Sequence, residues 1–565
     1  MPKGDNVSMT ATDTHTEIHD DHGLVDTTQT GDGLYQLVAS NDHKMVGRLW
    51  IGASLLLLIA IMILGLVNSL ERVSLGDTEI FGSVTKYFQS WVLFRTGAIF
   101  MVAIPLFIGI ATAIVPLQVG SASIAFPRLV AASFWSWLFA SGVHIASFGA
   151  DGGLGPEAGT RTEGTLLTIV SLGFMIVALL AASVCIATTI VALRPEGMSL
   201  LRVPAFTWSM LVATSVWLFS LPVLIANLIY SYVDLQGRLP IEFGLRDTLW
   251  SRVEWAWSQP QVFAYAIPVL GVLAEIVPVS AKHRQANRNV LLSLIGLFGV
   301  LSFGAWAQSF LSRGADPAFQ VAANSDDRGV FLYDEFLYIV FGLAIVIPVL
   351  ALLGGVLDTI RRGSTPKPDA ALLGSIAGAL LLLAAVVAGE LRVWPWWWEA
   401  LHEDHVLLSS SSAILSLVLA AVVASAVGAL AFWAPKIFGG YAKDSVAMTA
   451  VMLFLGGGLL AGMADMISAF SGQPDISVTN NVDSIVDTMN VMVVIGVAMM
   501  AVGALALLGA LIPAARSNEQ LPDDPWDGHT LEWAAPSPPP IGNFIEQIPT
   551  VSSAEPLLDE FEEVS

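Results

Sequence analysis

Trp257-Ser258-Gln259-Pro260-Gln261-Val262-Phe263 lies within an apolar stretch, residues 253–281, that is long enough to cross a lipid bilayer as a helix. The chain of 565 residues is 55% hydrophobic and 13% charged, and its mean hydropathy is +0.70. A soluble domain carries about 25% charged residues. Most of this chain must therefore lie in lipid, and the composition predicts an integral membrane protein.

The chain contains about twelve stretches that reach the roughly 20 apolar residues needed to span a bilayer. Lipid offers no partner for backbone polar groups, so each stretch must be a helix. We predict an all-α membrane protein with twelve transmembrane helices. The expected spans are residues 47–69, 91–119, 129–150, 164–194, 203–233, 253–281, 289–312, 331–358, 371–392, 405–434, 445–470 and 487–513.

Three regions follow from the distribution of polar residues. Residues 1–40 are acidic and poor in large apolar residues, which predicts a disordered tail. Residues 41–515 form the predicted twelve-helix domain. Residues 516–565 are polar, acidic and Pro-rich, which predicts an extended tail without a packed domain. The net charge of −22 comes largely from the tails and loops, and no basic patch indicates a nucleic-acid partner.

The loops differ in charge on the two sides of the predicted bundle. Connections on the side of the N-terminus are short and basic, whereas the others are longer and acidic. The positive-inside rule then places both termini in the cytoplasm. The basic residues that decide this are Lys44, Arg48, Arg194, Arg202, Lys282, Arg284, Arg288, Arg361, Arg362 and Lys367.

Several short motifs occur in one order along the chain. They are Asn41-Asp-His-Lys-Met-Val-Gly47, Pro116-Leu-Gln-Val-Gly120, Ala125-Phe-Pro-Arg-Leu129, Trp306-Ala307, Leu401-His402, and the run from Asp524-Pro-Trp through Thr530-Leu-Glu-Trp to Ser537-Pro-Pro-Pro. From about residue 41 to 545 the chain resembles cytochrome c oxidase subunit I, of the haem-copper oxidase superfamily. The resemblance implies the twelve-helix fold of that subunit and a bacterial inner membrane. It also implies two haems, one copper, oxygen reduction, proton pumping, and subunits II and III as partners.

The residues at the family's metal-binding positions are of other types. The resemblance places Gln259, Gln261 and Phe263 where the family has a copper histidine, a proton-gating acid and a cross-linked tyrosine. The family's pair of copper histidines is replaced by Gln308 and Ser309, and its two haem histidines are replaced by Ser410 and Ser412. The acid and the lysine of the family's proton pathways are replaced by Ser123 and Leu352. Haem iron and copper favour imidazole. The chain has nine histidines, and only His144 clearly falls inside a predicted span. We therefore expect no redox haem or copper bound in the family's way.

The polar side chains at these positions allow two interpretations. They can fill the space of the missing cofactors and hydrogen-bond between helices. Alternatively, they can line a wet pocket for a small polar ligand. Ionisable groups inside the spans, which are Glu275, Asp465, Arg95 and His144, are also candidates for function. Arg95 is expected to extend outward to the interface, and His144 to be a satisfied interior histidine.

The connection before the tenth span contains the best metal candidate. His402 and Glu403 fall where the resemblance implies an outer-face magnesium site, and carboxylate oxygen suits a hard cation. A solvated acidic loop is the alternative. Trp394-Pro-Trp-Trp-Trp398 fits an interfacial aromatic belt or, alternatively, a surface on which a ligand stacks.

Three functions remain open. The first is a redox-inactive paralogue of subunit I that acts as a scaffold, assembly or regulatory subunit of a respiratory-type complex. The second is a carrier or binding protein that uses the polar interior. The third is a working subunit of a terminal oxidase, which requires ligands from elsewhere.

Overall fold

The computed structural model describes nine stretches of the chain and one single residue, 473. They are residues 40–73, 80–154, 162–236, 253–307, 340–393, 405–471, 473, 484–517, 520–545 and 547–559. The side chains of residues 393 and 405–410 are not among those described. Residues from Asn41 onward form one compact unit.

The prediction of twelve transmembrane helices is confirmed. Within the described stretches, twelve helices are long and apolar enough to cross a membrane. Four spans depart from a continuous α-helix: the second contains a π-helical turn, the sixth begins with a short helix, the seventh ends in a 3-10 turn after a break, and the eighth is broken at residue 345. The elements are α2 (His43–Glu71), α3 (Val84–Gly97), η1 (Ala98–Ala103), α4 (Ile104–Gln118), α5 (Pro127–Gly149), α6 (Thr162–Ala192), α7 (Ala205–Leu235), η2 (Glu254–Ala256), α9 (Gln261–Ala264), α10 (Ile267–Ala281), α11 (Arg288–Leu301), η3 (Ala305–Ala307), α15 (Val346–Arg362), α16 (Ala370–Val393), α18 (His405–Ile437), α19 (Asp444–Phe470), α20 (Ser484–Arg516) and η4 (Leu531–Ala534).

Local sequence signals account for where several helices begin and end. The Asp42 side chain accepts a hydrogen bond from the backbone N–H of Lys44 and caps α2. Ser83 caps α3 in the same way. Pro127 stands in the first turn of α5, where the missing N–H is not needed. Lys282 adopts a left-handed conformation with φ 52° and ends α10.

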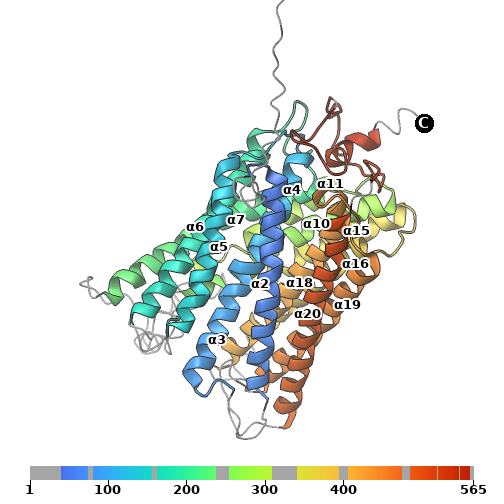
Figure 1. The fold of residues 1–565 in the computed structure, drawn as a ribbon. Helices are drawn as coiled ribbons and strands as arrows, with labels where there is room; N and C mark the ends of the chain where they lie inside the picture. The colour runs from blue at the N-terminus through green and yellow to red at the C-terminus, as the bar shows by residue number, and fades with distance from the viewer. Residues whose placement is uncertain are drawn as a thin grey trace, which may run out of the picture. The chain divides into compact units, whose positions relative to one another are not determined.

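Helices that are neighbours in sequence pack side by side, as α19 does with α20, α16 with α18, and α5 with α6 (Figure 1). Small residues permit the closest contacts. A Cβ added to Gly374 would lie 2.6 Å from the backbone nitrogen of Gly428 across the α16–α18 interface. The hydrophobic effect does not drive helices together in lipid. Close van der Waals packing between small residues stabilises their association instead.

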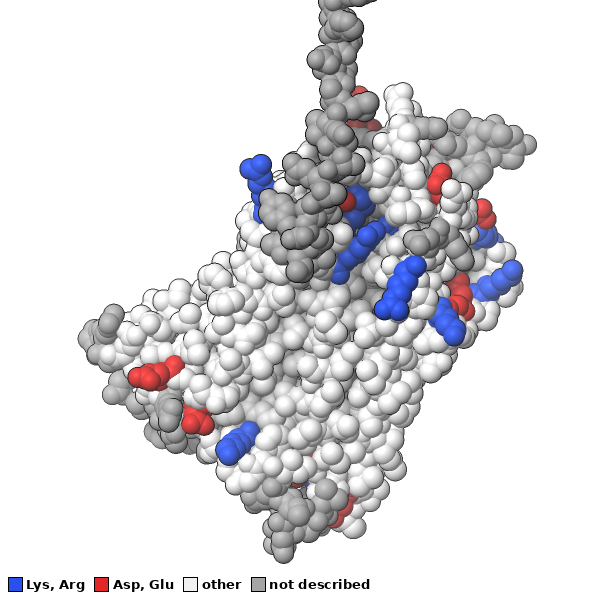
Figure 2. Space-filling view, viewed as in Figure 1, with Lys and Arg blue, Asp and Glu red and all other residues white. Residues whose placement is uncertain are grey.

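Three spans form the centre of the bundle. The most apolar windows of Val84–Gln118 and Gln261–Ala281 are entirely buried by other helices, and that of Ser411–Ile437 is nearly so. The outer helices expose large apolar side chains such as Phe139 and Phe219, which suit contact with lipid acyl chains. On the face shown in Figure 2, the charged side chains lie toward the two ends of the helices and leave an uncharged belt between them.

The residues predicted to form an extended tail contain little regular structure and lie against the helix ends (Figure 1). We call residues 520–545 and 547–559 the C-terminal segment, and the helix ends that contact it the covered end. Four basic residues at this end hold the segment, and each makes at least one polar contact with it. These contacts include Lys44 Nζ to the Pro540 carbonyl at 3.1 Å, Lys282 Nζ to Asp527 at 2.8 Å, Arg284 to Asp559 at 2.6 Å, and Lys436 Nζ to the Asp523 carbonyl at 2.8 Å.

Candidate functional site

The segment that resembles the family's copper site is buried at the centre of the bundle. Gln259, Gln261 and Phe263 are each at most 1% exposed. Two hydrogen bonds fix the turn that carries them. The Tyr265 hydroxyl donates to the Ala256 carbonyl at 2.7 Å, and the Trp217 indole N–H donates to the Ala264 carbonyl at 3.0 Å.

Both ends of the Gln261 amide have partners in the protein. Its Nε2 donates to the Ser220 hydroxyl in α7 at 3.0 Å, and its Oε1 accepts from the Gly304 backbone N–H at 2.9 Å. Gly304 lies so close that an added Cβ would stand 2.5 Å from the Gln261 Cβ. Gln261 thus links two helices and a loop, as the helix-bonding interpretation requires.

Gln259 behaves differently from Gln261. It is equally buried, yet among the described residues neither its Oε1 nor its Nε2 has a hydrogen-bond partner. Gly389 of α16 packs against it, since an added Cβ there would lie 2.7 Å from the Gln259 Oε1. Such an amide bears the cost of leaving water without the compensation of a hydrogen bond. Gln259 therefore matches the wet-pocket interpretation better than Gln261 does.

The two glutamines provide a matched pair of substitutions. Gln261→Leu should lower the free energy of unfolding by about 1–3 kcal/mol, because it leaves the buried Gly304 N–H without its acceptor. Gln259→Leu should be neutral or stabilising, because no partner is lost. Thermal unfolding of the purified variants in detergent measures the difference. Equal effects of the two substitutions would contradict this assignment.

Ser412 is bonded to a buried cation. Arg95 Nη2 donates to the Ser412 hydroxyl at 2.5 Å, and the Arg95 guanidinium lies 3.5 Å from the centre of the Trp91 ring. The expectation that Arg95 extends outward is wrong, because its side chain is fully buried. Stacking on an aromatic face stabilises a desolvated guanidinium. The Ser410 side chain and residues Gln308 and Ser309 lie outside the part of the chain that the structure describes.

His144 in α5 contacts two hydroxyl groups. Its Nε2 lies 3.0 Å from Thr96 Oγ1 and its Nδ1 3.1 Å from Ser171 Oγ, in α3 and α6. Both ring nitrogens are thus occupied by the protein, which leaves no free nitrogen for a metal. His144 is the satisfied interior histidine that the sequence indicates.

The two proton-pathway positions carry no titratable group. Leu352 of α15 is fully buried among apolar side chains. The Ser123 carbonyl accepts from the Ser121 hydroxyl at 2.7 Å within a turn. Neither side chain can take up or release a proton near neutral pH.

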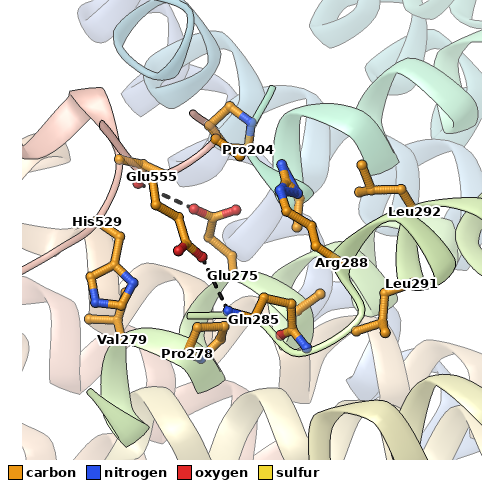
Figure 3. A pocket seen from close by; sticks show the side chains of 14 residues that line it. Pro204, Glu275, Pro278, Val279, Gln285, Arg288, Leu291, Leu292, His529 and Glu555 are labelled. Atoms are coloured by element: carbon orange, nitrogen blue, oxygen red, sulfur yellow. Dashed lines mark hydrogen bonds between the residues drawn. The ribbon is translucent and has the colours of Figure 1, made fainter. Parts of the chain in front are cut away.

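A second polar site lies beneath the C-terminal segment. A cavity of about 30 Å³ is bounded by the start of α7, the end of α10, the start of α11 and the C-terminal segment (Figure 3). Its polar lining includes Glu275, Gln285, Arg288, His529, Thr530 and Glu555. This space suffices for about one or two water molecules, and the lining offers several polar partners.

Glu275 is the most deeply placed acid of this cavity. Its Oε2 accepts from the Phe206 backbone N–H at 3.1 Å and its Oε1 from the Thr530 hydroxyl at 3.3 Å. Phe206 belongs to α7 and Thr530 to the C-terminal segment, so the Glu275 carboxyl group joins three elements. The sequence singles out Glu275 as an intramembrane acid, but its link to Thr530, 255 residues away, has no signal in the pattern.

The histidine and the outer acid of the cavity are also electrostatically perturbed. Burial, together with Lys282 and Arg284, lowers the pKa of His529 to about 4, so the ring is neutral at pH 7. Burial raises the pKa of Glu555, whose Oε1 accepts from the Gln285 backbone N–H at 3.3 Å. His529 Nδ1 and Arg288 Nε have no hydrogen-bond partner in the described stretches and are suited to bind water.

The predicted outer magnesium site cannot be placed, since His402 and Glu403 lie outside the described residues, as do Trp394 to Trp398. Among the residues that are described, no group of three or more histidine, cysteine, aspartate or glutamate side chains could hold a metal ion.

The donors at the described family positions do not fit haem iron or copper. An amide is a poor ligand for either metal, and both polar atoms of Gln261 are already bonded. The Ser412 hydroxyl accepts from Arg95, a cation that would repel a nearby metal ion. The described residues of this region therefore support packing and hydrogen bonding rather than coordination.

Comparison with known proteins assigns the family. Residues 45–500 match the family described as "Cytochrome C and Quinol oxidase polypeptide I". The chain is 28% identical to cytochrome c oxidase subunit 1 of Bacillus subtilis (strain 168), over 95% of this chain and 85% of that protein. It is 26% identical to quinol oxidase subunit 1 of the same strain, over 93% and 80%. The fold is similar to that of a heme-copper terminal oxidase dimer, with a TM-score of 0.61, 11% identity and 84% of each chain covered. The chain belongs to the cytochrome c and quinol oxidase polypeptide I family, the haem-copper oxidase subunit I proteins.

Proposed function

We propose that this protein is a redox-inactive paralogue of subunit I that acts as a scaffold, assembly or regulatory subunit of a respiratory-type membrane complex. One observation carries the proposal. At the position of the family's gating acid, Gln261 bonds to Ser220 and Gly304 and so takes a structural role. The chain's shortage of histidines within the spans, where the family needs six, supports it further.

The proposed partners are oxidase-type subunits II and III, with lipid around the bundle. The names of the two Bacillus subtilis relatives describe each of them as a subunit 1, and this chain spans most of their length. We further propose the bacterial inner membrane, with the covered end in the cytoplasm. Lys44, Lys282 and Arg284 lie at that end, as the positive-inside rule requires. A green fluorescent protein fused to the C-terminus should fluoresce, and a dark but intact fusion would count against this orientation.

Cofactor content provides the direct test. The purified protein, isolated with any partners that remain bound, should contain far less than one haem and one copper per chain. A pyridine haemochrome spectrum and elemental analysis measure both, with the Bacillus subtilis cytochrome c oxidase subunit 1 prepared in parallel as the control. Two haems per chain would overturn the proposal and favour a working terminal oxidase. Purification as a monomer without partners would argue against a scaffold.

The unpartnered amide of Gln259 favours a second candidate function, the binding of a small polar ligand in the bundle. A ligand that bonds to both Oε1 and Nε2 would remove the energetic cost of burying them. Native mass spectrometry would then show an added mass on the wild-type protein that is missing from Gln259→Leu. Identical masses in the two spectra would remove this candidate.

A further inference from the structure

Two buried glutamates approach each other beneath the C-terminal segment. Glu275 of α10 is 6% exposed and Glu532 of the segment is fully buried. The two carboxyl groups lie close enough to repel each other when both are charged. Thr530 connects them: its hydroxyl donates to Glu275 Oε1 at 3.3 Å, and the same side chain lies beside the Glu532 carboxyl group.

The hydrogen bonds of Glu532 leave one oxygen unused. Its Oε1 accepts from Gln118 Nε2 at 2.9 Å and from the Trp433 indole N–H at 3.3 Å. Its Oε2 is buried and has no hydrogen-bond partner within the part of the chain that the structure describes. A proton on this oxygen would turn it into a donor, for which Thr530 offers a lone pair.

The Thr530 hydroxyl has one hydrogen and two lone pairs. Its hydrogen is directed to Glu275 Oε1. A hydrogen bond between Thr530 and the unused Glu532 Oε2 then requires Glu532 to donate to the hydroxyl oxygen and therefore to be protonated. The arrangement fits one carboxylate and one carboxylic acid, and it fits two carboxylates poorly.

The cations near Glu275 and Glu532 form hydrogen bonds to backbone carbonyl groups. Arg288 of α11 donates to the Val203 carbonyl, and Lys436 of α18 donates to the carbonyls of Asp523 and Ala535. Among the described residues, neither glutamate forms an ion pair. The other titratable groups around the pair belong to the C-terminal segment and are His529, which is neutral at pH 7, and Asp523, Asp524 and Glu555.

We propose that Glu275, Thr530 and Glu532 form a proton-binding site that holds one proton between the two glutamates while the C-terminal segment is docked. The cavity beside Glu275 provides the water through which this proton exchanges with solvent. The proton comes from water when the segment docks and returns to water when it leaves. Burial raises the pKa of Glu532, which agrees with a proton retained in the docked state.

Infrared difference spectroscopy of the full-length protein at pH 7 tests the site. Glu275→Gln and Glu532→Gln should each remove the carbonyl band of one protonated carboxyl group. The double variant should remove no more than either single variant, because only one proton is shared. Glu555→Gln serves as the control and should leave this band in place. An additive loss in the double variant, or no loss in either single variant, would overturn the proposal.

The pH dependence of docking gives a second, independent readout. A carboxyl group whose pKa is raised by docking favours the docked state when protonated, so docking weakens as the pH rises. Between about pH 7.5 and 9 the His529 contribution is nearly constant, because a free histidine with a pKa near 6.5 is then also mostly neutral. Hydrogen exchange of residues 523–535, corrected for intrinsic rates, should lose protection by up to about tenfold per pH unit in the wild type. Glu532→Gln, whose amide replaces the acid, should remove this dependence, and an unchanged dependence would contradict a shared proton.

Discussion

Replacing Asp465 with leucine is expected to lower the free energy of unfolding by about 3–5 kcal/mol. Asp465 of α19 lies 2.7 Å from Arg72, at the end of α2, and both side chains are less than 10% exposed. Arg72 is also bonded to Gln473 at 3.3 Å, and its carbonyl accepts from Asn490 of α20 at 3.0 Å. The substitution leaves the buried Arg72 guanidinium without its carboxylate. This unpaired charge destabilises the fold by more than the intact ion pair stabilises it.

Two variants make the Asp465 experiment decisive. The double variant Arg72→Met and Asp465→Leu removes both charges and should recover most of the lost stability. Asp358→Asn breaks a surface pair with Arg362, at the similar distance of 2.8 Å, and should change stability by less than about 1 kcal/mol. Thermal unfolding in detergent, followed by the loss of monodisperse protein, compares them. If the double variant were no more stable than Asp465→Leu alone, the unpaired buried charge of Arg72 would not be the cause of the lost stability.

The helices could be predicted because the bilayer imposes a strong constraint on composition. A span needs enough apolar residues and must bond its own backbone, so apolar length alone identifies it. The hydrogen-bond partners of side chains inside the bundle are harder to predict from the sequence. Gln259 and Gln261 are two residues apart and chemically identical, yet only Gln261 finds partners, in Ser220 and Gly304. Those partners come from other elements, and nothing in the local sequence specifies them.

The position of the Arg95 side chain was also determined by a residue that is distant in the sequence. An arginine near the end of a span usually extends to water, and that rule fails here because Trp91 and Ser412 provide a buried alternative. Ser412 is 317 residues away in the sequence. The preference of one side chain for the interface is small, and a single well-placed partner outweighs it.

The contacts of the C-terminal segment were beyond prediction for a different reason. The segment has no helical or strand periodicity, and several of its contacts use backbone carbonyls, as those of Lys44 with Pro540 and Lys436 with Asp523 do. Because every residue has a backbone carbonyl, the residue types do not indicate which carbonyl will accept such a hydrogen bond. The polar composition predicts that the segment lies outside lipid, but it does not show that the segment packs.

The second large effect is expected at Trp533, which anchors the C-terminal segment. Its ring is 1% exposed and packs edge-on against Phe432 of α18, with ring centres 5.1 Å apart. Lys436 Nζ lies 5.2 Å from the ring centre. Gly528 is required beside it, since an added Cβ would lie 2.1 Å from the indole. Trp533→Ala should cost about 3–5 kcal/mol of docking free energy, because a large buried ring is lost and a cavity remains.

This cost should appear in the segment before it appears in the bundle. Trp533 lies outside the spans, where water drives the burial of apolar surface, whereas the helices pack in lipid without that driving force. Hydrogen exchange of residues 523–545 should therefore accelerate strongly in Trp533→Ala, while exchange within α18 and α19 changes little. Ile541→Ala, in the same segment but 94% exposed, is the control and should leave exchange unchanged. If Trp533→Ala kept wild-type protection in the segment, the ion pairs of Lys282 and Arg284 would have to hold it without the anchor.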